Sequence, residues 1–398
     1  MFRKIVFWTH LTLGLVAGLA VAIMCLTGAA LAFEKDLIGW AERDARKVPT
    51  ADLVKPRLPL DDLLQRVYTA KPDSRINSLT IANDPRTAIA LGLPGNALLH
   101  VNPYTGELRE AHAPKMRAFM RTMIAWHIRL NFRPGADNLG RKVNSAANLI
   151  FVLLCLSGLV LWWPRNWSAR VLRPSLWFVR DARGRARDWN WHNVIGFWSL
   201  PVLVILGASG VVLSYRWAGD LVFHLAGEAP PVPPGVTPRP AAAAVPGRAP
   251  APQTARPLVA ANGARPTLAA IVAGIEPTFP GWDLITVRFA PPLQSAAIPN
   301  PTLTLAVRTR ESPPFAQSTL TVDARTGHVR RTEAFADLSA GTRARRWLRF
   351  LHTGEAFRAP GQAIAGVACV GALVLVWTGF ALAWRRWRGR PASALRYD

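Results

Sequence analysis

The sequence is poor in acidic residues and in cysteine. It contains 24 Asp and Glu against 48 Lys and Arg, and only 3 cysteines in 398 residues. Cys25, Cys155 and Cys369 all lie inside long apolar blocks, where cysteine behaves as a small buried hydrophobe, so no disulfide framework is expected outside those blocks. A Gly-rich dinucleotide-binding fingerprint is also absent, and the chain is therefore not expected to oxidise NAD(P)H itself.

Long apolar runs, in contrast, are plentiful. Four blocks contain runs of roughly 20 apolar residues, the length that a helix needs to cross a bilayer. They are Ile5 to Phe33, Val143 to Trp163, Val194 to Tyr215 and Ile364 to Trp384, and no other stretch qualifies. The first block resembles a signal peptide, with a basic start and Ala30-Leu31-Ala32 near its end, but its apolar run is longer than usual, which favours an uncleaved anchor. These blocks predict an integral membrane protein with four transmembrane helices.

The net charge of +24 could indicate nucleic-acid binding, but its distribution favours membrane topology. Basic residues cluster before the first block, after the second and after the last, namely Arg3, Lys4, Arg165, Arg170, Arg173, Arg180, Arg183, Arg185, Arg187, Arg385, Arg386, Arg388 and Arg390. Tryptophans crowd the same boundaries as an aromatic belt. We therefore expect these three segments, and both termini, on the cytoplasmic side of a bacterial inner membrane, and no nucleic-acid partner.

This topology divides the chain into eleven parts. We expect transmembrane helices over 1–33, 143–163, 192–217 and 364–384, soluble periplasmic domains over 34–120 and 267–345, interfacial histidine-bearing segments over 121–142 and 346–363, an Arg-rich cytoplasmic loop over 164–191, a Pro/Ala-rich linker over 218–266 and a cytoplasmic tail over 385–398. The linker contains too few bulky apolar residues to fold. Apolar and polar residues alternate over Leu284–Phe289, Thr302–Val307 and Leu320–Val322, which predicts strands.

An internal repeat runs through the chain. His10 and His192 are each followed by a glycine four residues later. Each is also followed by a hydroxyl residue and a second glycine, at Thr27-Gly28 and Ser209-Gly210, and the second glycine lies 18 residues after the histidine in both cases. His127 and His352 are each followed by Phe-Arg, then by Pro-Gly, and later by Ser157-Gly158 or Thr378-Gly379. The soluble segments share a turn, Asn102 to Gly106 against Asp323 to Gly327, in which glycine would take a positive φ. We infer a duplicated helix–domain–helix unit with a pseudo-twofold axis along the membrane normal, which gives a four-helix α-helical membrane bundle with two periplasmic α+β domains.

Topology and symmetry together place four histidines in two layers. His10 and His192 begin helices that run outward and should meet at the cytoplasmic face, and His127 and His352 precede helices that run inward and should meet at the periplasmic face. A lone histidine there could simply rest at the headgroup level, but ionisable residues in or beside membrane helices are usually functional. Two facing imidazoles suit haem iron, whose other four ligands come from the porphyrin, whereas zinc would need four protein ligands.

The neighbouring residues agree with haem. Gly14 and Gly196 lie one turn from their histidines and leave room for a flat macrocycle, although small residues can also serve helix packing. Basic side chains could pair with haem propionates, namely Arg129, Arg133 and Arg358 on the outer side and Arg3, Lys4 and Arg187 on the inner side. Glu355 is the nearest carboxylate to a ligand histidine. His100, His112, His224 and His328 fall outside the repeat and are expected at the surface.

Several motifs together resemble the PepSY-associated transmembrane family. They are the histidine with glycine four residues later, Thr-Gly or Ser-Gly near the far end of the helix, Asn102 to Glu107, Trp126 to Leu130, Leu351 to Glu355 and the closing Trp384-Arg385-Arg386. The resemblance covers nearly the whole chain apart from the linker. Members look like inner-membrane, iron-regulated proteins, including di-haem reductases of ferric siderophores, which implies haem ligation by His10, His127, His192 and His352. The turns at Thr105-Gly106 and Thr326-Gly327 would then belong to two PepSY-type domains.

The resulting prediction is a bilayer-embedded electron-transfer protein with two b-type haems. His10 and His192 would bind the cytoplasmic haem, and His127 and His352 the periplasmic one. A quinol or a cytoplasmic donor would supply electrons, and a periplasmic ferric siderophore would be reduced so that ferrous iron is released. Two alternatives remain open: a haem-free PepSY membrane sensor or protease-modulating protein, and a quinol-linked cytochrome b that feeds another periplasmic acceptor.

Overall fold

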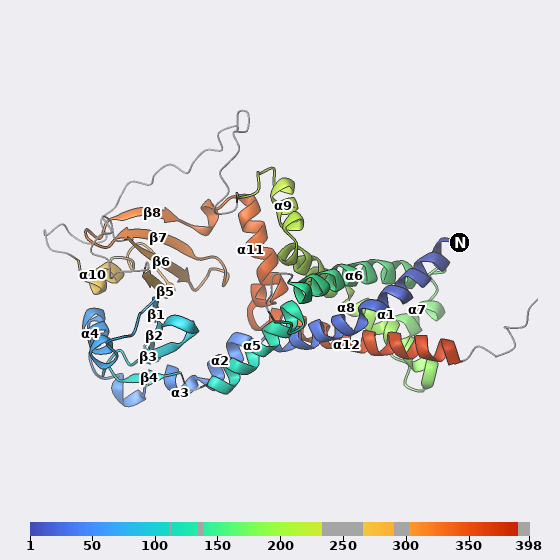
Figure 1. Cartoon of the computed structure of the whole chain (residues 1–398), viewed down its shortest axis with the longest axis horizontal. Helices are drawn as coiled ribbons and strands as arrows, with labels where there is room; N and C mark the ends of the chain where they lie inside the picture. The colour runs from blue at the N-terminus through green and yellow to red at the C-terminus, as the bar shows by residue number, and fades with distance from the viewer. Residues whose placement is uncertain (112, 134–137, 233–265, 290–301, 389–398) are drawn as a thin grey trace, which may run out of the picture. The chain divides into compact units, whose positions relative to one another are not determined.

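The computed structural model describes residues 1–111, 113–133, 138–232, 266–289 and 302–388 (Figure 1). The chain divides into two compact units, a helical unit and a sheet unit. The helical unit comprises residues 1–34, 118–229 and 344–398, and the sheet unit comprises residues 35–117 and 230–343.

Four helices of the helical unit are long and apolar enough to cross a membrane, as the sequence predicts. They are α1 (Phe2–Leu31), α6 (Leu139–Trp162), α8 (Gly184–Ser214) and α12 (Arg358–Arg388). Helices α1 and α8 each pack against both α6 and α12, so α1 and α8 occupy opposite corners of a four-helix bundle (Figure 1). Shorter helices complete this unit: α5 (Pro114–Arg129), α7 (Ala169–Leu176), α9 (Arg216–Leu225), α11 (Ala340–His352) and the 3-10 turn η4 (Glu355–Phe357).

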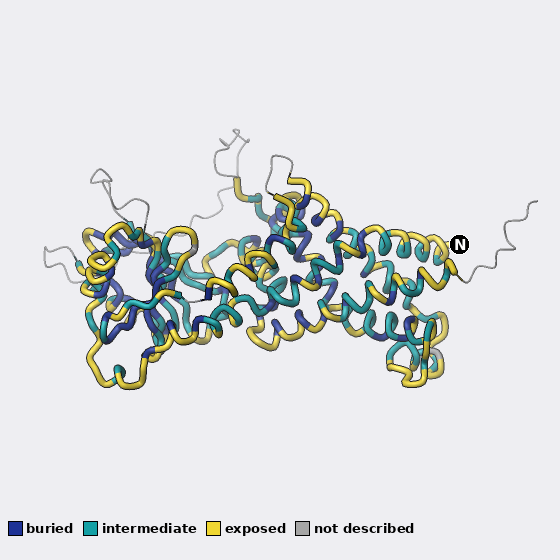
Figure 2. The backbone as a smooth tube through the Cα atoms, turned by 60° about the horizontal axis from the view of Figure 1, so that its bottom comes forward, coloured by how far each residue is buried: buried dark blue, intermediate teal, exposed yellow. Residues whose placement is uncertain are grey.

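Small side chains occupy the helix contacts, and large apolar side chains point outward. Ala17 on α1 and Ala372 on α12 are buried at 3% and 1% exposure, whereas Val16 and Val367 are each 73% exposed. Small residues let helix backbones approach closely, and outward apolar side chains are stable only in contact with lipid. In Figure 2 the long helices are coloured mostly as intermediate or exposed, with patches of buried residues along them. The helical unit therefore has the surface of a membrane protein.

The sheet unit is built on one antiparallel sheet of eight strands in the order β4-β3-β2-β1-β5-β6-β7-β8. The strands are β1 (Ser78–Ala82), β2 (Ile89–Gly92), β3 (Leu98–Val101), β4 (Leu108–Glu110), β5 (Trp282–Phe289), β6 (Thr302–Thr309), β7 (Ser318–Asp323) and β8 (Val329–Glu333). The three predicted strands correspond to β5, β6 and β7, so that expectation is confirmed. Strands β1 and β5 pair across the middle, with Leu79 opposite Val287 and Ile81 opposite Ile285.

Two helices pack on this sheet and share its core. Helix α4 (Leu60–Ala70) contributes Leu63 and Val67, and helix α10 (Leu268–Ala273) contributes Ile271, all within the same buried cluster as the strand residues. The carboxylate of Asp61 accepts hydrogen bonds from the backbone N–H groups of Leu268 at 3.0 Å and of the next residue at 3.1 Å. A carboxylate at a helix N-terminus satisfies free N–H groups, so this contact joins the two sequence segments of the unit.

The remaining elements are α2 (Glu34–Ala41), α3 (Arg43–Arg46), η1 (Thr50–Asp52), η2 (Pro94–Asn96) and η3 (Phe335–Asp337).

The two turns that the repeat predicts have the same geometry. Gly106 has a φ of +74° and Gly327 a φ of +69°, as expected where glycine ends a tight turn. Oδ1 of Asn102 accepts a hydrogen bond from the backbone N–H of Tyr104 at 3.0 Å, and Oδ1 of Asp323 accepts one from the backbone N–H of Arg325 at 2.9 Å. The prediction for these turns is confirmed.

The expected pair of soluble domains differs from the observed architecture in one respect. The strands of both soluble segments join at β1 and β5 into a single sheet, because each segment alone would leave β1 or β5 as an open edge. The two halves of the sheet run in mirrored order away from this junction, which is the order that two copies related by a twofold axis would take. The duplication itself and the side of the membrane stay predictions, and residues 233–265 of the predicted linker lie outside the described residues.

Candidate functional site

The four histidines of the repeat meet as two pairs inside the helical unit. The ring centroids of His10 and His192 are 6.4 Å apart, and those of His127 and His352 are 6.1 Å apart. These are the two pairs that the sequence predicts. His10 belongs to α1 and His192 to α8, which lie at opposite corners of the bundle, so their side chains meet across its interior.

The two pairs lie at opposite ends of the bundle. On α1, His10 belongs to the first pair and Thr27 contacts the second, and these residues are 17 positions apart. At a rise of 1.5 Å per residue the two levels are separated by about 25 Å, close to the thickness of the hydrocarbon core. His127 and His352 come from α5 and α11, which are not among the spanning helices.

Each histidine bonds a hydroxyl group on a neighbouring helix. The bonds join His10 Nδ1 to Ser157 Oγ at 2.8 Å, His127 Nδ1 to Thr27 Oγ1 at 3.0 Å, His192 Nδ1 to Thr378 Oγ1 at 2.9 Å and His352 Nδ1 to Ser209 Oγ at 3.1 Å. All four hydroxyl residues belong to the Thr-Gly and Ser-Gly motifs of the repeat. The sequence indicated these positions as repeat markers but did not predict that they contact the histidines.

The hydrogen bonds determine which ring nitrogen is protonated. Each of the four hydroxyls donates its proton to a carbonyl oxygen four residues earlier on its own helix, at 2.6 to 2.7 Å. A hydroxyl has one proton, so its oxygen must accept from Nδ1–H of the histidine. His127 and His352 also place Nδ1 at 3.0 Å from the backbone oxygens of Met24 and Leu206, which can only accept. The unprotonated Nε2 is therefore the nitrogen that can bind a metal.

The glycines of the same motifs leave space for the imidazole rings. A Cβ atom added at Gly28 or Gly210 would lie 3.2 Å from Cε1 of His127 or His352, and one at Gly158 would lie 3.4 Å from Cε1 of His10. These separations are tighter than ordinary van der Waals contact. The hydroxyl residue thus orients the ring, and the glycine beside it lets the ring approach the helix.

Gly14 and Gly196 have a different environment. A Cβ at Gly14 would meet only a methyl group of Leu154 at 3.8 Å, and one at Gly196 only a methyl group of Leu375 at 3.7 Å. An alanine would fit at either position without displacing protein atoms. Tight helix packing therefore does not require these glycines, and the space beside them is available to another group.

The spacing and composition of the pairs fit a metal held in a macrocycle. With a metal–nitrogen bond of about 2 Å and a ring nitrogen about 1 Å from the ring centroid, two imidazoles on one metal have centroids about 6 Å apart. Both observed separations agree with this value. Among the described residues, no three His, Cys, Asp or Glu side chains gather in a way that could hold a bare metal ion, and Glu355 does not complete such a group. The protein side chains thus offer two imidazoles at each level, which is the number that a haem iron can take from a protein.

The predicted propionate partners differ in their availability. Arg3 already donates to the backbone oxygen of Trp163 at 3.1 Å, and Arg187 bonds Asp188 at 2.9 Å. Arg129, two residues after His127, has a buried Nε without a hydrogen-bond partner. Lys4, Arg133 and Arg358 are exposed at the surface of the described chain.

Sequence reasoning missed one arginine at the other level. Arg386 on α12 also has a buried Nε without a partner, and its guanidinium lies 5.1 Å from the rings of both Phe7 and Trp8, just before His10. Each histidine pair therefore has one arginine nearby whose buried donor could bond an anionic group. In the sequence, Arg386 lies among the arginines after the last apolar block. Membrane topology alone accounts for basic residues there, so the sequence did not indicate a role for Arg386 beside the histidines.

The prediction that the other histidines lie at the surface is wrong for His100. This residue, on β3, is only 3% exposed, and both of its ring nitrogens lack hydrogen-bond partners. Burial lowers the pKa of His100, and the nearby carboxylate of Glu42 opposes that shift. His224 is exposed, His328 is half-buried, and His112 lies outside the described residues.

The family model for the PepSY-associated TM region matches residues 7–386, nearly the whole chain. No curated protein matches the sequence.

The hydroxyl contacts generate a prediction about stability. In Ser157→Ala, His10 Nδ1–H loses its hydroxyl acceptor, and we expect the helical unit to be destabilised by about 1–3 kcal/mol. Ser199→Ala is the matched control, because the Ser199 hydroxyl donates to the carbonyl oxygen of Ile195 on its own helix and contacts no ligand histidine. Thermal unfolding of the full chain in detergent measures both variants, and equal midpoints would contradict the proposed role of Ser157.

Proposed function

The chain belongs to the PepSY-associated TM family, and from this premise we propose that it is a di-haem electron-transfer protein that reduces ferric siderophores. Its two histidine pairs would hold two b-type haems, one near each face of a bacterial inner membrane. Electrons from a quinol or a cytoplasmic donor would reach a ferric chelate in the periplasm. One electron converts Fe(III) to Fe(II), which oxygen-rich siderophores hold more weakly.

The observation that carries this proposal is the equal geometry of the two histidine pairs. Both pairs have centroid separations near the value for two imidazoles on one metal, and all four rings use Nδ1 for hydrogen bonds and keep Nε2 for a ligand. A packing role for the histidines would not require the same nitrogen and the same type of hydroxyl partner at both levels.

The protein's own residues would perform three tasks. The hydroxyls of Ser157, Thr378, Thr27 and Ser209 fix the orientation of the histidines and make Nε2 more basic. Gly14 and Gly196 leave room beside one pair. Arg129 and Arg386 offer buried donors for carboxylates. Haem would supply one-electron chemistry, and with two histidines bound its iron would have no open position for oxygen or peroxide.

The proposed topology places both termini in the cytoplasm and the sheet unit in the periplasm. The support comes from the sequence, since basic residues flank the ends of the spanning helices that share a side with His10 and His192.

Haem content is the first test. We expect the purified full chain to be red and to contain about two haems, with His10→Ala and His352→Ala each removing a different one, because each change deletes a ligand at a different level. Absorption spectra of the oxidised and reduced protein measure this. A colourless protein from haem-sufficient cells would favour the haem-free sensor instead, and loss of the same spectral component in both variants would contradict the pairing.

The space beside Gly14 gives a second test. In Gly14→Ala, the added methyl group meets only one leucine methyl in the protein, so the folded chain should keep its thermal midpoint. The haem of the His10–His192 pair should be bound at least about tenfold more weakly, because the methyl group would occupy the space of the macrocycle. Haem titration of the full chain measures the affinity. Gly219→Ala controls for a general cost of substitution, because Gly219 is also helical, on α9, and an added Cβ there would lie no closer than 3.6 Å to a neighbouring atom.

The acceptor is tested with the reduced protein. We expect a ferric tris-hydroxamate or tris-catecholate chelate to reoxidise it faster than buffer does, with release of one ferrous ion per electron. The corresponding gallium(III) chelates have the same charge and shape but cannot be reduced, so they should leave the spectrum unchanged. If no ferric chelate reoxidises the protein while a different periplasmic acceptor does, the chain is a cytochrome b that feeds that acceptor.

A further inference from the structure

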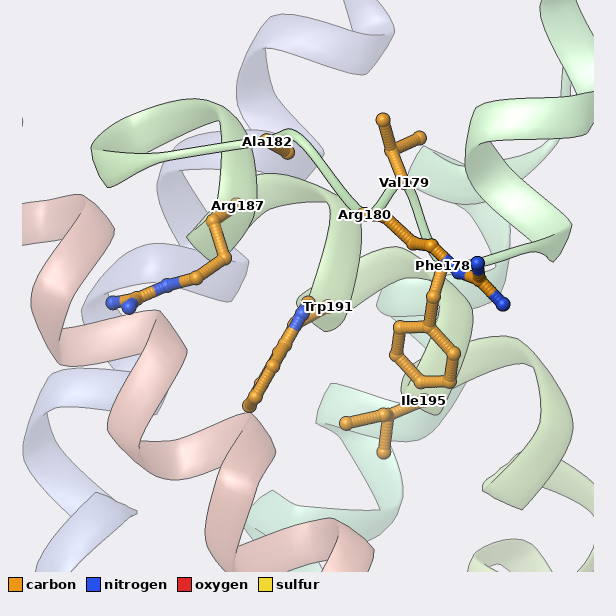
Figure 3. A pocket seen from close by; sticks show the side chains of 7 residues that line it. All are labelled: Phe178, Val179, Arg180, Ala182, Arg187, Trp191 and Ile195. Carbon is orange, nitrogen blue, oxygen red and sulfur yellow. The ribbon is translucent and has the colours of Figure 1, made fainter.

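A cavity of about 340 Å³ lies beside the beginning of α8 in the helical unit (Figure 3). Residues 178–182, which precede α8, form one side, and Arg187, Trp191 and Ile195 on α8 form the other. Figure 3 shows the indole of Trp191 and the ring of Phe178 projecting from these two sides. The volume is within the range of small-molecule sites.

The cavity is separate from the space between His10 and His192. Arg187, Trp191 and Ile195 are spaced four residues apart and share one face of α8. Trp191 directly precedes His192, and one residue turns a helix by about 100°, so this face lies next to the histidine-bearing face. Trp377, which directly precedes the His192 partner Thr378, contacts Trp191 with ring centroids 6.3 Å apart. A ligand in the cavity would therefore be in contact with the immediate neighbours of the His192 level.

The lining favours a planar ring with oxygen atoms. Phe178 and Trp191 meet edge to face at 6.1 Å, and Val179, Ala182 and Ile195 add apolar surface. The guanidinium of Arg187 lies over the ring of Trp191 at 5.8 Å, and Arg180 provides a second set of donors. Mostly apolar walls with a few fixed donors are typical of sites for small amphipathic ligands.

We propose that this cavity binds the ring of an isoprenoid quinol or quinone from the bilayer. The inference rests on the proposed function for the ligand's role as electron donor, and it deepens that function by locating where the donor binds. A protein donor would require a docking surface and not a cavity of this size. The sequence also has no dinucleotide-binding fingerprint that would favour a nicotinamide donor.

An anionic lipid headgroup fits the cavity less well. Its phosphate would favour several cations, but of the two arginines that line the cavity Arg187 is already bonded to the carboxylate of Asp188, which is fully buried and also bonded to Arg385 at 3.1 Å. Of these two arginines, only Arg180 would be left to balance the phosphate. The Arg187 charge is thus largely balanced, and the side chain can still donate to a neutral carbonyl or hydroxyl oxygen.

The cavity is specific to one copy of the repeat. The alignment that places His192 on His10 places Arg187 on Ile5 and Trp191 on Thr9, neither of which can provide the same contacts. The histidines and their hydroxyl partners occur in both copies, as expected for a shared scaffold. A feature present in one copy only is expected for a site that is needed once, such as the site of an electron donor.

The test combines a photoreactive azidoquinone with equilibrium binding of a decyl-substituted benzoquinone to the full chain in phosphatidylcholine nanodiscs. We expect crosslinks to fall within residues 178–195. Trp191→Leu should weaken quinone binding about tenfold through loss of the aromatic wall, and Arg180→Gln, at an exposed position, should also weaken it several-fold. Trp189→Leu is the matched control, since Trp189 is on the same helix, is 45% exposed and does not line the cavity, and it should bind as the unchanged protein does.

Crosslinks elsewhere, or unchanged binding in both Trp191→Leu and Arg180→Gln, would overturn the proposal. So would displacement of the quinone by phosphatidylglycerol, since the occupant would then be an anionic lipid. Haem content and quinone binding, measured on the same unchanged chain, separate the two hypotheses. If the chain binds quinone but contains no haem, the quinone site is supported and the proposed di-haem function is contradicted. If the chain contains haem but binds no quinone, the quinone site is contradicted and the di-haem function is not.

Discussion

The helical unit depends on one kind of contact, the hydrogen bond from a buried imidazole N–H to a hydroxyl on another helix. The hydroxyl proton is already committed to its own helix, so the oxygen can only accept, and the imidazole can only donate through Nδ1. A buried donor without its acceptor would be costly, which holds each pair of helices in a fixed register. The same bond leaves Nε2 unprotonated, and one contact thereby determines both the packing of the helices and the chemistry that the histidines can support.

Much of this arrangement could be predicted from the sequence, because it follows from physical requirements that act along the chain. A bilayer demands about 20 apolar residues per crossing, which defines α1, α6, α8 and α12. The repeat then paired His10 with His192 and His127 with His352. What the sequence could not specify were contacts between helices: which hydroxyl meets which histidine depends on the rotation of each helix about its axis. The burial of His100 was missed for a related reason, since a single polar residue in a short strand does not show which face of the sheet it occupies.

In any open sheet the edge strands leave backbone N–H and C=O groups without partners, and this applies to the strands of the two soluble segments. Taken alone, each half would end at β1 or β5 with a row of unpaired backbone groups. Pairing these strands buries Leu79, Ile81, Ile285 and Val287 in one core and removes both edges at once. Two sequence segments separated by a spanning helix pair thus form one folding unit, and neither is expected to be stable without the other.

The two histidine pairs are almost equivalent in their ligands but not in their surroundings. Asp188, fully buried between Arg187 and Arg385, stands one turn before His192, and the matching position before His10 is Val6. If the proposed haems are bound, this buried charge cluster would change the energy of the one beside His192, whereas the same pair of histidine ligands could not distinguish one haem from the other. In the proposed function, a direction for electron flow would therefore come from such unmatched residues. In the proposed electron-transfer protein with two similar halves, the positions at which the halves differ would be the ones that separate an electron-accepting side from an electron-donating side.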